Sequence, residues 1–165
     1  MKPFVVAIAL CFVSSFSFSQ SDSIPLYKQN PIIPSFKLMR ADSSFFQLQD
    51  IVKKKHATVV IIFSPTCSHC QHQAEEITSH MKDFENVNFI FSTLYPVQDM
   101  KTYINDYGLD KFPNITVGHD KGYNLGTFYQ ISSLPGIFVY DKKGKLVANF
   151  ESNVKSETLL EALAK

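Results

Sequence analysis

Residues 58–77 decide the fold, and they read Thr58-Val-Val-Ile-Ile-Phe-Ser-Pro-Thr-Cys67-Ser-His-Cys70-Gln-His-Gln-Ala-Glu-Glu-Ile77. The unbroken run of β-branched and aromatic residues from Thr58 to Phe63 predicts a strand that is buried on both faces. A short turn should follow at 64–66, and a helix should begin near Cys67. Apolar residues then recur every three or four positions, which predicts one buried stripe along the helix. The stripe consists of Cys70, Ala74, Ile77, Met81 and Phe84.

This helix places the two sulfur atoms in different environments. Cys70 heads the buried stripe, whereas Cys67 lies off the stripe at the helix N-terminus, where it can meet solvent. Unpaired backbone N–H groups and the positive end of the helix dipole stabilise an anion at that position. Because the thiolate is the form that attacks a disulfide, we expect Cys67 to be the attacking sulfur and Cys70 the resolving one.

The first residues are typical of a secretory signal peptide. A basic residue precedes an apolar core at 4–13, and Ser17-Phe18-Ser19 offers small residues at the cleavage offsets. We therefore expect residues 1–19 to be cut off after Ser19 and the mature protein to be exported to the periplasm. Lipidation of Cys11 is the less favoured alternative, because the large residue before it does not suit that processing site.

The composition limits the classes of function. The chain has room for one domain, and its 16 basic and 15 acidic residues indicate neither nucleic-acid binding nor a polybasic membrane patch. Cleavage of the signal peptide leaves Cys67 and Cys70 as the remaining cysteines. A disulfide between residues so close in sequence closes too small a loop to stabilise a fold much. The two cysteines are therefore interpreted as a reactive pair rather than as a disulfide that stabilises the fold.

The rest of the chain alternates between strands and helices. Residues 20–34 contain three prolines and are predicted to form an extended arm before a domain at 35–165. The alternation predicts an α/β fold with a mixed sheet covered by helices on both faces. Strands are expected at 35–39, 45–48, 87–93, 114–117, 137–140 and 146–150, and helices at 50–55, 96–108, 125–129 and after Ser156, which we expect to cap the last one.

Four features of the sequence carry a family resemblance. They are the strand entering Cys67-Ser-His-Cys70, the N-terminal hairpin, the inserted strand and helix at 87–108, and Ser133-Leu-Pro-Gly-Ile-Phe-Val-Tyr-Asp-Lys-Lys-Gly-Lys145. Together they resemble the thioredoxin superfamily, and within it the exported TlpA/ResA-like thiol-disulfide oxidoreductases. The resemblance implies a thioredoxin-like fold over residues 35–165, with a mixed central sheet, helices on both faces and an N-terminal β-hairpin.

The resemblance also implies the other site residues. Pro135 matches the family's cis-proline, which faces the active-site cysteines. Leu134 and Pro135, with Thr66 beside the first cysteine, are expected to bind an extended segment of the substrate. No cofactor and no metal are implied, because a pair of sulfur atoms carries the electrons.

Three positions depart from the family pattern. Thr66 stands where thioredoxins usually have an aromatic residue. Ile61 and Gln73 stand where members of the family often have a carboxylic acid that could take a proton from the buried thiol. Glu75 or Glu76 could substitute, although both are expected to lie in water. The proton acceptor for Cys70 is therefore not identified by the sequence.

His69 bears on the direction of electron flow. Its imidazolium, together with the helix terminus, should stabilise the Cys67 thiolate. Stabilising the reduced form makes the disulfide a better oxidant, whereas the larger part of the sequence resembles the reductases. We favour a reductase or general exchange role, and a disulfide-forming oxidant of the same fold is the alternative.

The sequence therefore predicts an enzyme that exchanges disulfides with protein substrates and is reduced again by a membrane-bound redox partner. Two other classes stay open. The cluster of Cys67, His69, Cys70 and His72 suggests a copper- or zinc-handling protein. A non-catalytic binding module with incidental thiols is the other class.

Overall fold

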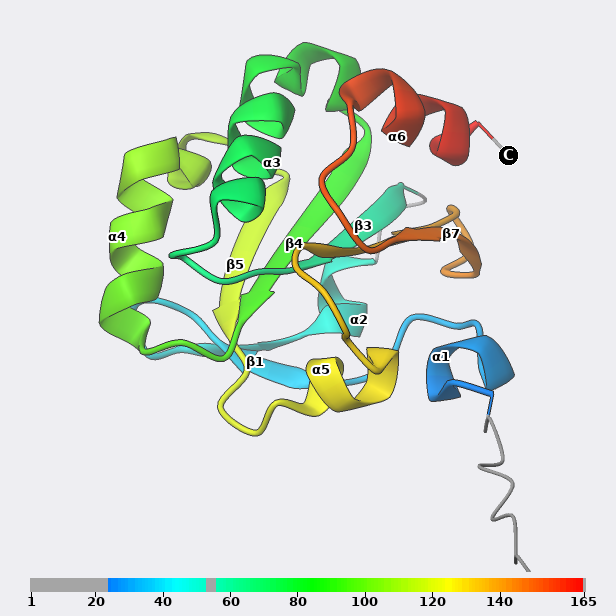
Figure 1. Cartoon of the computed structure of the whole chain (residues 1–165), viewed down its shortest axis with the longest axis horizontal. Helices are drawn as coiled ribbons and strands as arrows, with labels where there is room; N and C mark the ends of the chain where they lie inside the picture. Colours follow the sequence, from blue (N-terminus) through cyan, green and yellow to red (C-terminus); the bar gives the residue numbers. More distant parts are fainter. Residues whose placement is uncertain (1–23, 53–55, 165) are drawn as a thin grey trace, which may run out of the picture.

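The expected alternation of strands and helices is present in the computed structural model, which describes residues 24–52 and 56–164 (Figure 1). The predicted signal peptide at 1–19 lies outside the described residues. The strands are β1 Lys37–Met39, β2 Phe45–Gln47, β3 Ala57–Ile62, β4 Val87–Thr93, β5 Ile115–His119, β6 Gly136–Tyr140 and β7 Leu146–Phe150. The helices are α1 Leu26–Gln29, α2 Leu48–Ile51, α3 Ser68–Ser79, α4 Val97–Tyr107, α5 Asn124–Tyr129 and α6 Ser156–Leu163, with short 3-10 helices η1 Met81–Phe84 and η2 Leu109–Lys111.

The seven strands form one mixed sheet in the order β2-β1-β5-β4-β3-β6-β7. Strands β3, β4 and β5 are parallel, and the remaining neighbours are antiparallel. Because β6 runs antiparallel to β3 and Gly136 pairs with Ile62, the residue just before β6 lies beside the turn that follows β3. This register brings Pro135 next to the cysteine turn, although more than sixty residues separate them in the sequence.

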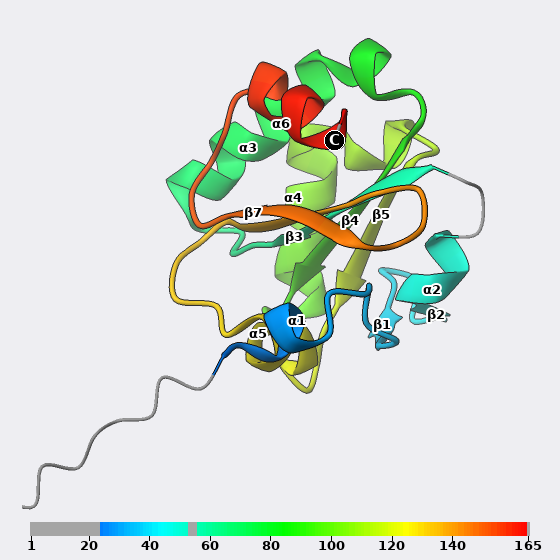
Figure 2. The same cartoon turned by 90° about the vertical axis from the view of Figure 1, so that its right-hand side faces the viewer.

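Two apolar cores lie on opposite faces of the sheet, because successive side chains of a strand point to opposite sides. Val59 and Ile61 pack into the core under α3, α4 and α6. Val60 and Ile62 pack into the core on the side of α1, α2 and α5. Figure 2 shows these two groups of helices on opposite sides of the sheet. The predicted thioredoxin-like α/β fold, with its N-terminal hairpin β1–β2 and helices on both faces, is confirmed.

The segment before the domain differs from the predicted extended arm. It contains helix α1, and Tyr27 of that helix is buried with its ring 5.2 Å from the Phe138 ring. After the helix, Ile33 donates its N–H to Gly144 O at 2.9 Å and is also buried. The prediction of an extended arm is wrong for α1, where one helical turn places the Tyr27 ring against Phe138.

The start of α6 also differs from the prediction. Lys155 occupies the N-cap position without a side-chain hydrogen bond, and Ser156 is the first residue of the helix. The backbone N–H of Ser156 donates to Glu76 Oε1 of α3 at 2.8 Å. Helix α6 is therefore capped by a residue of the neighbouring helix, and the prediction that Ser156 caps its own helix is wrong.

Candidate active site

The two cysteines lie at the start of α3, as the spacing of apolar residues predicts. Cys67 is the N-cap residue, and its Sγ accepts a hydrogen bond from the backbone N–H of Cys70 at 3.4 Å. Cys67 is partly exposed, whereas Cys70 is 1% exposed, and both are free thiols. An N-cap sulfur that accepts a backbone N–H sits where the unpaired donors and the dipole of the helix stabilise negative charge.

The buried position of Cys70 makes its thiol a weak acid. Burial, followed by the hydrogen bond with Cys67, raises the pKa of Cys70 to about 12, while the backbone N–H of Ser64 acts in the opposite direction. Desolvation disfavours the thiolate because the charged form loses water. The geometry therefore assigns different chemistry to the sulfurs, with Cys67 accessible to a partner and Cys70 held as a neutral thiol behind it.

The loop before β6 faces Cys67. The Leu134–Pro135 peptide bond is cis, as the resemblance implies. The Cys67 thiol donates to the backbone oxygen of Leu134 at 3.7 Å. On the other side of the loop, Ser132 Oγ donates to Glu151 Oε2 at 2.9 Å, and Ser133 Oγ donates to the backbone oxygen of Glu151. The structure thus brings Leu134 to the accessible sulfur and fixes the loop to the end of β7.

Thr66 and His69 flank the cysteines on the exposed surface. Thr66 Oγ1 lies 3.1 Å from Ser64 Oγ, which closes the turn between β3 and α3. The exposed His69 ring turns toward Asn153, with its Nδ1 3.1 Å from Asn153 Oδ1. The roles of Thr66 in substrate binding and of His69 in stabilising the thiolate stay predictions.

Tyr103 of α4 is a site residue that the sequence analysis missed. Its buried hydroxyl donates to the backbone oxygen of Cys70 at 2.6 Å. Its ring lies 4.4 Å from the Phe63 ring, at the end of the strand that leads into the cysteine turn. Burial raises the pKa of Tyr103 well above its usual range, so the hydroxyl keeps its proton. Tyr103 therefore holds the first turn of α3 on the core.

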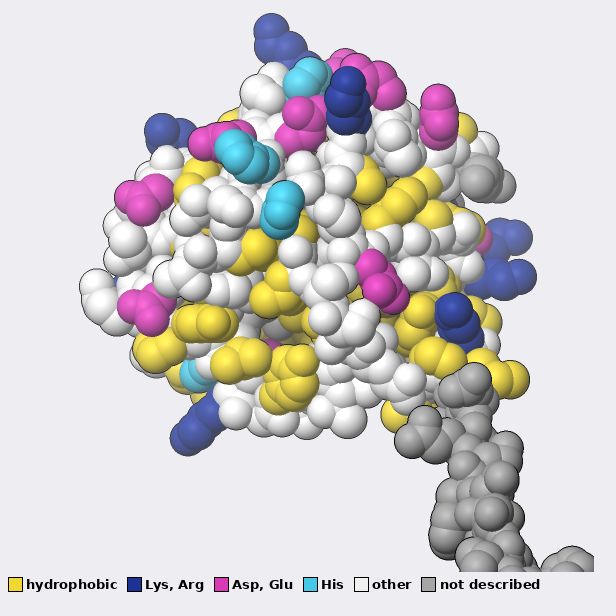
Figure 3. All heavy atoms as spheres, viewed as in Figure 1, with side chains coloured by type: hydrophobic (Ala, Val, Ile, Leu, Met, Phe, Trp, Pro, Cys, Tyr) yellow, Lys and Arg dark blue, Asp and Glu magenta, His cyan; other side chains and the backbone are white. Residues whose placement is uncertain are grey.

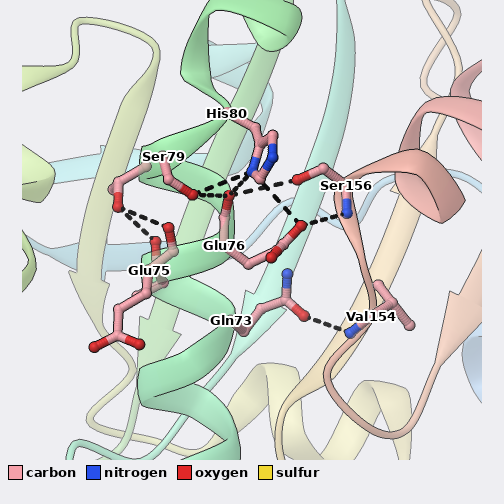
Figure 4. Close-up of polar contacts among 9 residues, drawn as sticks. Gln73, Glu75, Glu76, Ser79, His80, Val154 and Ser156 are labelled. Carbon is pink, nitrogen blue, oxygen red and sulfur yellow. Dashed lines mark hydrogen bonds and ion pairs between the residues drawn. The ribbon is translucent and has the colours of Figure 1, made fainter.

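The sequence identifies Gln73 as a departure from the family pattern but does not predict its burial or its partner. It is fully buried one turn after Cys70, and its Oε1 accepts the backbone N–H of Val154 at 2.7 Å (Figure 4). Its Nε2 is buried, and within the described part of the chain it has no hydrogen-bond partner. An amide has no basic site at neutral pH, so Gln73 cannot take the proton of Cys70. Its hydrogen bond to Val154 instead links α3 to the chain entering α6.

The two nearby glutamates are committed to other contacts. The backbone N–H of Ser156 lowers the pKa of Glu76, and Glu76 is half-buried rather than free in water. Glu75 Oε2 lies 3.3 Å from His72 Nδ1 on the exposed side of α3, and its carboxylate points away from Gln73 in Figure 4. The His80 ring also has a hydrogen-bond partner, since its Nδ1 lies 2.9 Å from the backbone oxygen of Glu76. None of these contacts joins a carboxylate to Cys70.

The histidines of α3 do not converge with the cysteines on a metal site. Across residues 24–52 and 56–164, no group of three or more His, Cys, Asp or Glu side chains is arranged to hold a metal ion. His69 and His72 point to separate partners, Asn153 and Glu75. Four tetrahedral ligands are the usual requirement of structural zinc. The local geometry therefore gives no support to a metal-handling role.

No helix within the described ranges is both long and apolar enough to span a membrane.

Solved structures of similar fold include a disulfide oxidoreductase and a peroxidoxin. A secreted disulfide oxidoreductase of Mycobacterium tuberculosis, homologous to Escherichia coli DsbE, is 16% identical, with a TM-score of 0.65 over 79% of this chain and 96% of that chain. Peroxidoxin BcpB of the same organism is 14% identical, with a TM-score of 0.65 over 81% and 92%. StoA of Bacillus subtilis is 16% identical, with a TM-score of 0.61 over 80% and 98%. At such low identities the likeness establishes the fold.

A comparison with the curated proteins found no match. A model of the AhpC/TSA family matches residues 30–149, which include the cysteine turn, the cis-proline loop and all seven strands except the last residue of β7. The chain therefore belongs to the AhpC/TSA family and has a thioredoxin-like fold.

Proposed function

We propose that this chain is an exported thiol-disulfide oxidoreductase of the TlpA/ResA-like type, which reduces or exchanges disulfides in protein substrates through Cys67 and Cys70. The observation that carries the proposal is the difference between the two sulfurs. Cys67 is accessible at the N-terminus of α3, and Cys70 is buried directly behind it with its N–H on Cys67 Sγ. An accessible nucleophile with a protected resolving thiol is the arrangement that dithiol exchange requires.

The reaction proceeds in two exchange steps. The Cys67 thiolate attacks one sulfur of a substrate disulfide, a bond forms between Cys67 and that sulfur, and the other substrate sulfur leaves as a thiolate. Cys70 then loses its proton and attacks Cys67 Sγ, which releases the second substrate sulfur as a thiolate. The substrate gains two electrons, and the protein becomes the Cys67–Cys70 disulfide.

Residues around the sulfurs would align the substrate. In this scheme Leu134 and Pro135 face the backbone of an extended substrate segment, and Thr66 borders it on the other side. The distance of 3.7 Å between Cys67 Sγ and Leu134 O supports this role, because a segment bound at Leu134 would lie beside the attacking sulfur. His69, one residue before Cys70, would favour the thiolate when its ring is protonated.

The cycle needs a reductant for the Cys67–Cys70 disulfide. A membrane-bound redox partner on the exported side would supply the two electrons, and residues 1–19 support export because they have the features of a cleaved signal peptide. The direction of electron flow follows from the reduction potential of the pair. A value of about −270 mV, as in thioredoxin, indicates a reductase, and one of about −120 mV indicates a disulfide-forming oxidant.

Trapping of mixed disulfides tests the proposal. A Cys70→Ser variant cannot resolve the first intermediate and should accumulate substrates bound to Cys67 in cells and with insulin in vitro. Cys67→Ser is the matched control and should trap nothing. If the two variants retain equal amounts of disulfide-linked protein, the assigned roles are wrong. Parallel titration with Cu(I) and Zn(II) tests the metal-handling alternative, which requires stoichiometric binding that depends on both cysteines.

A further inference from the structure

A small groove opens beside the cysteine turn. Its volume is about 230 Å³, which is below the range of about 300–1,000 Å³ in which pockets usually enclose a whole small-molecule ligand. The groove lies between the chain after β3, the chain after β4, the residue before α5 and the cis-proline loop. It is lined by Ile62, Phe63, Leu94, Tyr95, Tyr123, Ile131, Ser132, Ser133 and Leu134.

The groove adjoins the reacting sulfur through Leu134. Leu134 lines the groove, and its backbone oxygen is the atom that lies 3.7 Å from Cys67 Sγ. Phe63, which also lines the groove, is the first residue after β3 and leads into the cysteine turn. Its backbone N–H donates to Ser92 O at 2.9 Å. A chain that presents its cysteine to Cys67 along Leu134 would therefore place a neighbouring side chain at the groove.

The outer wall of the groove exposes apolar surface in a fixed arrangement. Leu94 is 50% exposed and Tyr123 is 39% exposed. Tyr123 has a positive φ of 52°, and its ring lies so close to α5 that a Cβ added at Gly126 would be 2.0 Å from it. Figure 3 shows apolar side chains gathered over the β4–α4 connection and α5. Exposed apolar side chains that gather into a patch mark interaction sites.

The chemistry of the lining selects the occupant. No residue of the lining carries a charge, and its polar side-chain groups are the hydroxyls of Tyr95, Tyr123, Ser132 and Ser133. A charged side chain would lose water there and find no opposite charge in the lining, whereas an aliphatic or aromatic one would gain contacts. The limited volume suits one large side chain rather than a second folded surface.

We infer that this groove is a specificity pocket for an aliphatic or aromatic side chain adjoining the reacting cysteine of an extended protein substrate. The inference rests on the proposed exchange activity and adds the substrate class. Leu94 and Tyr123 are its specificity-determining residues. A matched side chain in an apolar pocket changes kcat/KM by about 10-fold or more.

The test compares two peptide disulfides that differ only in having Leu or Ser beside the cysteine. Bis(2-hydroxyethyl) disulfide, which has no such side chain, serves as the reference substrate. The wild-type protein should reduce the Leu peptide with a kcat/KM about 10-fold above that of the Ser peptide. Leu94→Ser and Tyr123→Asn should each lower the ratio of Leu-peptide to reference kcat/KM, and Asn suits the positive φ at that position.

Phe45→Ser is the matched control, because Phe45 is 55% exposed on β2 at the far edge of the sheet. Its Leu preference should equal that of the wild type. A Leu preference that survives in both groove variants, or that is absent from the wild type, would overturn the inference. Failure to reduce any of the three disulfides would instead refute the exchange activity itself. Self-association of the protein that is lost in Leu94→Ser and Tyr123→Asn would assign the groove to a second copy and also overturn it.

Discussion

The burial of Cys70 makes the second exchange step strongly dependent on pH. With the pKa of Cys70 raised to about 12 by burial, only about one molecule in 100,000 carries the thiolate at pH 7. The neighbouring Gln73 cannot accept the proton, and the carboxylates of Glu75 and Glu76 are committed to His72 and Ser156. The thiolate fraction, and with it the rate of resolution, should rise about 10-fold for each unit of pH between about pH 6 and pH 9.

A single-turnover experiment measures this step. Reduced protein is mixed with a peptide disulfide at each pH, samples are quenched in acid, and mass spectrometry follows the peptide bound to Cys67. The mixed disulfide should accumulate at low pH and decay with a rate constant that increases about 100-fold over two units. In Cys70→Ser it should persist at every pH. A decay rate in the wild type that is independent of pH would show that a base in the protein already holds the Cys70 proton.

Substitutions at three residues test the contacts around the site. Gln73→Glu should speed resolution at neutral pH and flatten its pH dependence in the same quench assay, because a carboxylate one turn after Cys70 can accept its proton; an unchanged profile would exclude a base at that position. Tyr103→Phe should lower the free energy of unfolding in urea by about 1–2 kcal/mol, because the backbone oxygen of Cys70 loses a buried partner; no loss would mean that the hydrogen bond is replaced. Glu76→Ala should cost about 1 kcal/mol by removing the cap on Ser156, and Glu76→Gln should recover part of that loss; equal stability of all three proteins would rule out capping.

The cysteine turn could be predicted in detail because its information is local. The apolar run of β3 specifies one strand, and the spacing of the stripe specifies a helix with one buried face. All five stripe residues are buried as expected, but α3 ends at Ser79, and Met81 and Phe84 lie on the 3-10 helix η1 instead. The position of Cys67 off the stripe follows from the same periodicity. The Leu134–Pro135 loop was placed by resemblance, and the antiparallel register of β3 and β6 explains why it faces the cysteines.

The contacts that support the turn could not be predicted, because their partners are distant in sequence. Tyr103 follows Met100 on the buried face of α4, but its hydrogen-bond acceptor lies 33 residues earlier. Glu76 and Ser156 are 80 residues apart, so no local pattern reveals that one helix caps another. Gln73 offered a signal, since it is a polar residue between the apolar stripe positions Cys70 and Ala74. A buried polar side chain requires a partner, but the sequence does not name it.

The different roles of the two sulfurs can be tested by the order in which the two reduced cysteines react with iodoacetamide near neutral pH. Peptide mapping by mass spectrometry after increasing times gives a rate for each sulfur in the folded protein. We expect Cys67 to be alkylated first and Cys70 to stay a thiol until the protein is unfolded. Alkylation of Cys70 as fast as Cys67, or protection of both, would contradict the division of roles on which the proposed exchange reaction depends.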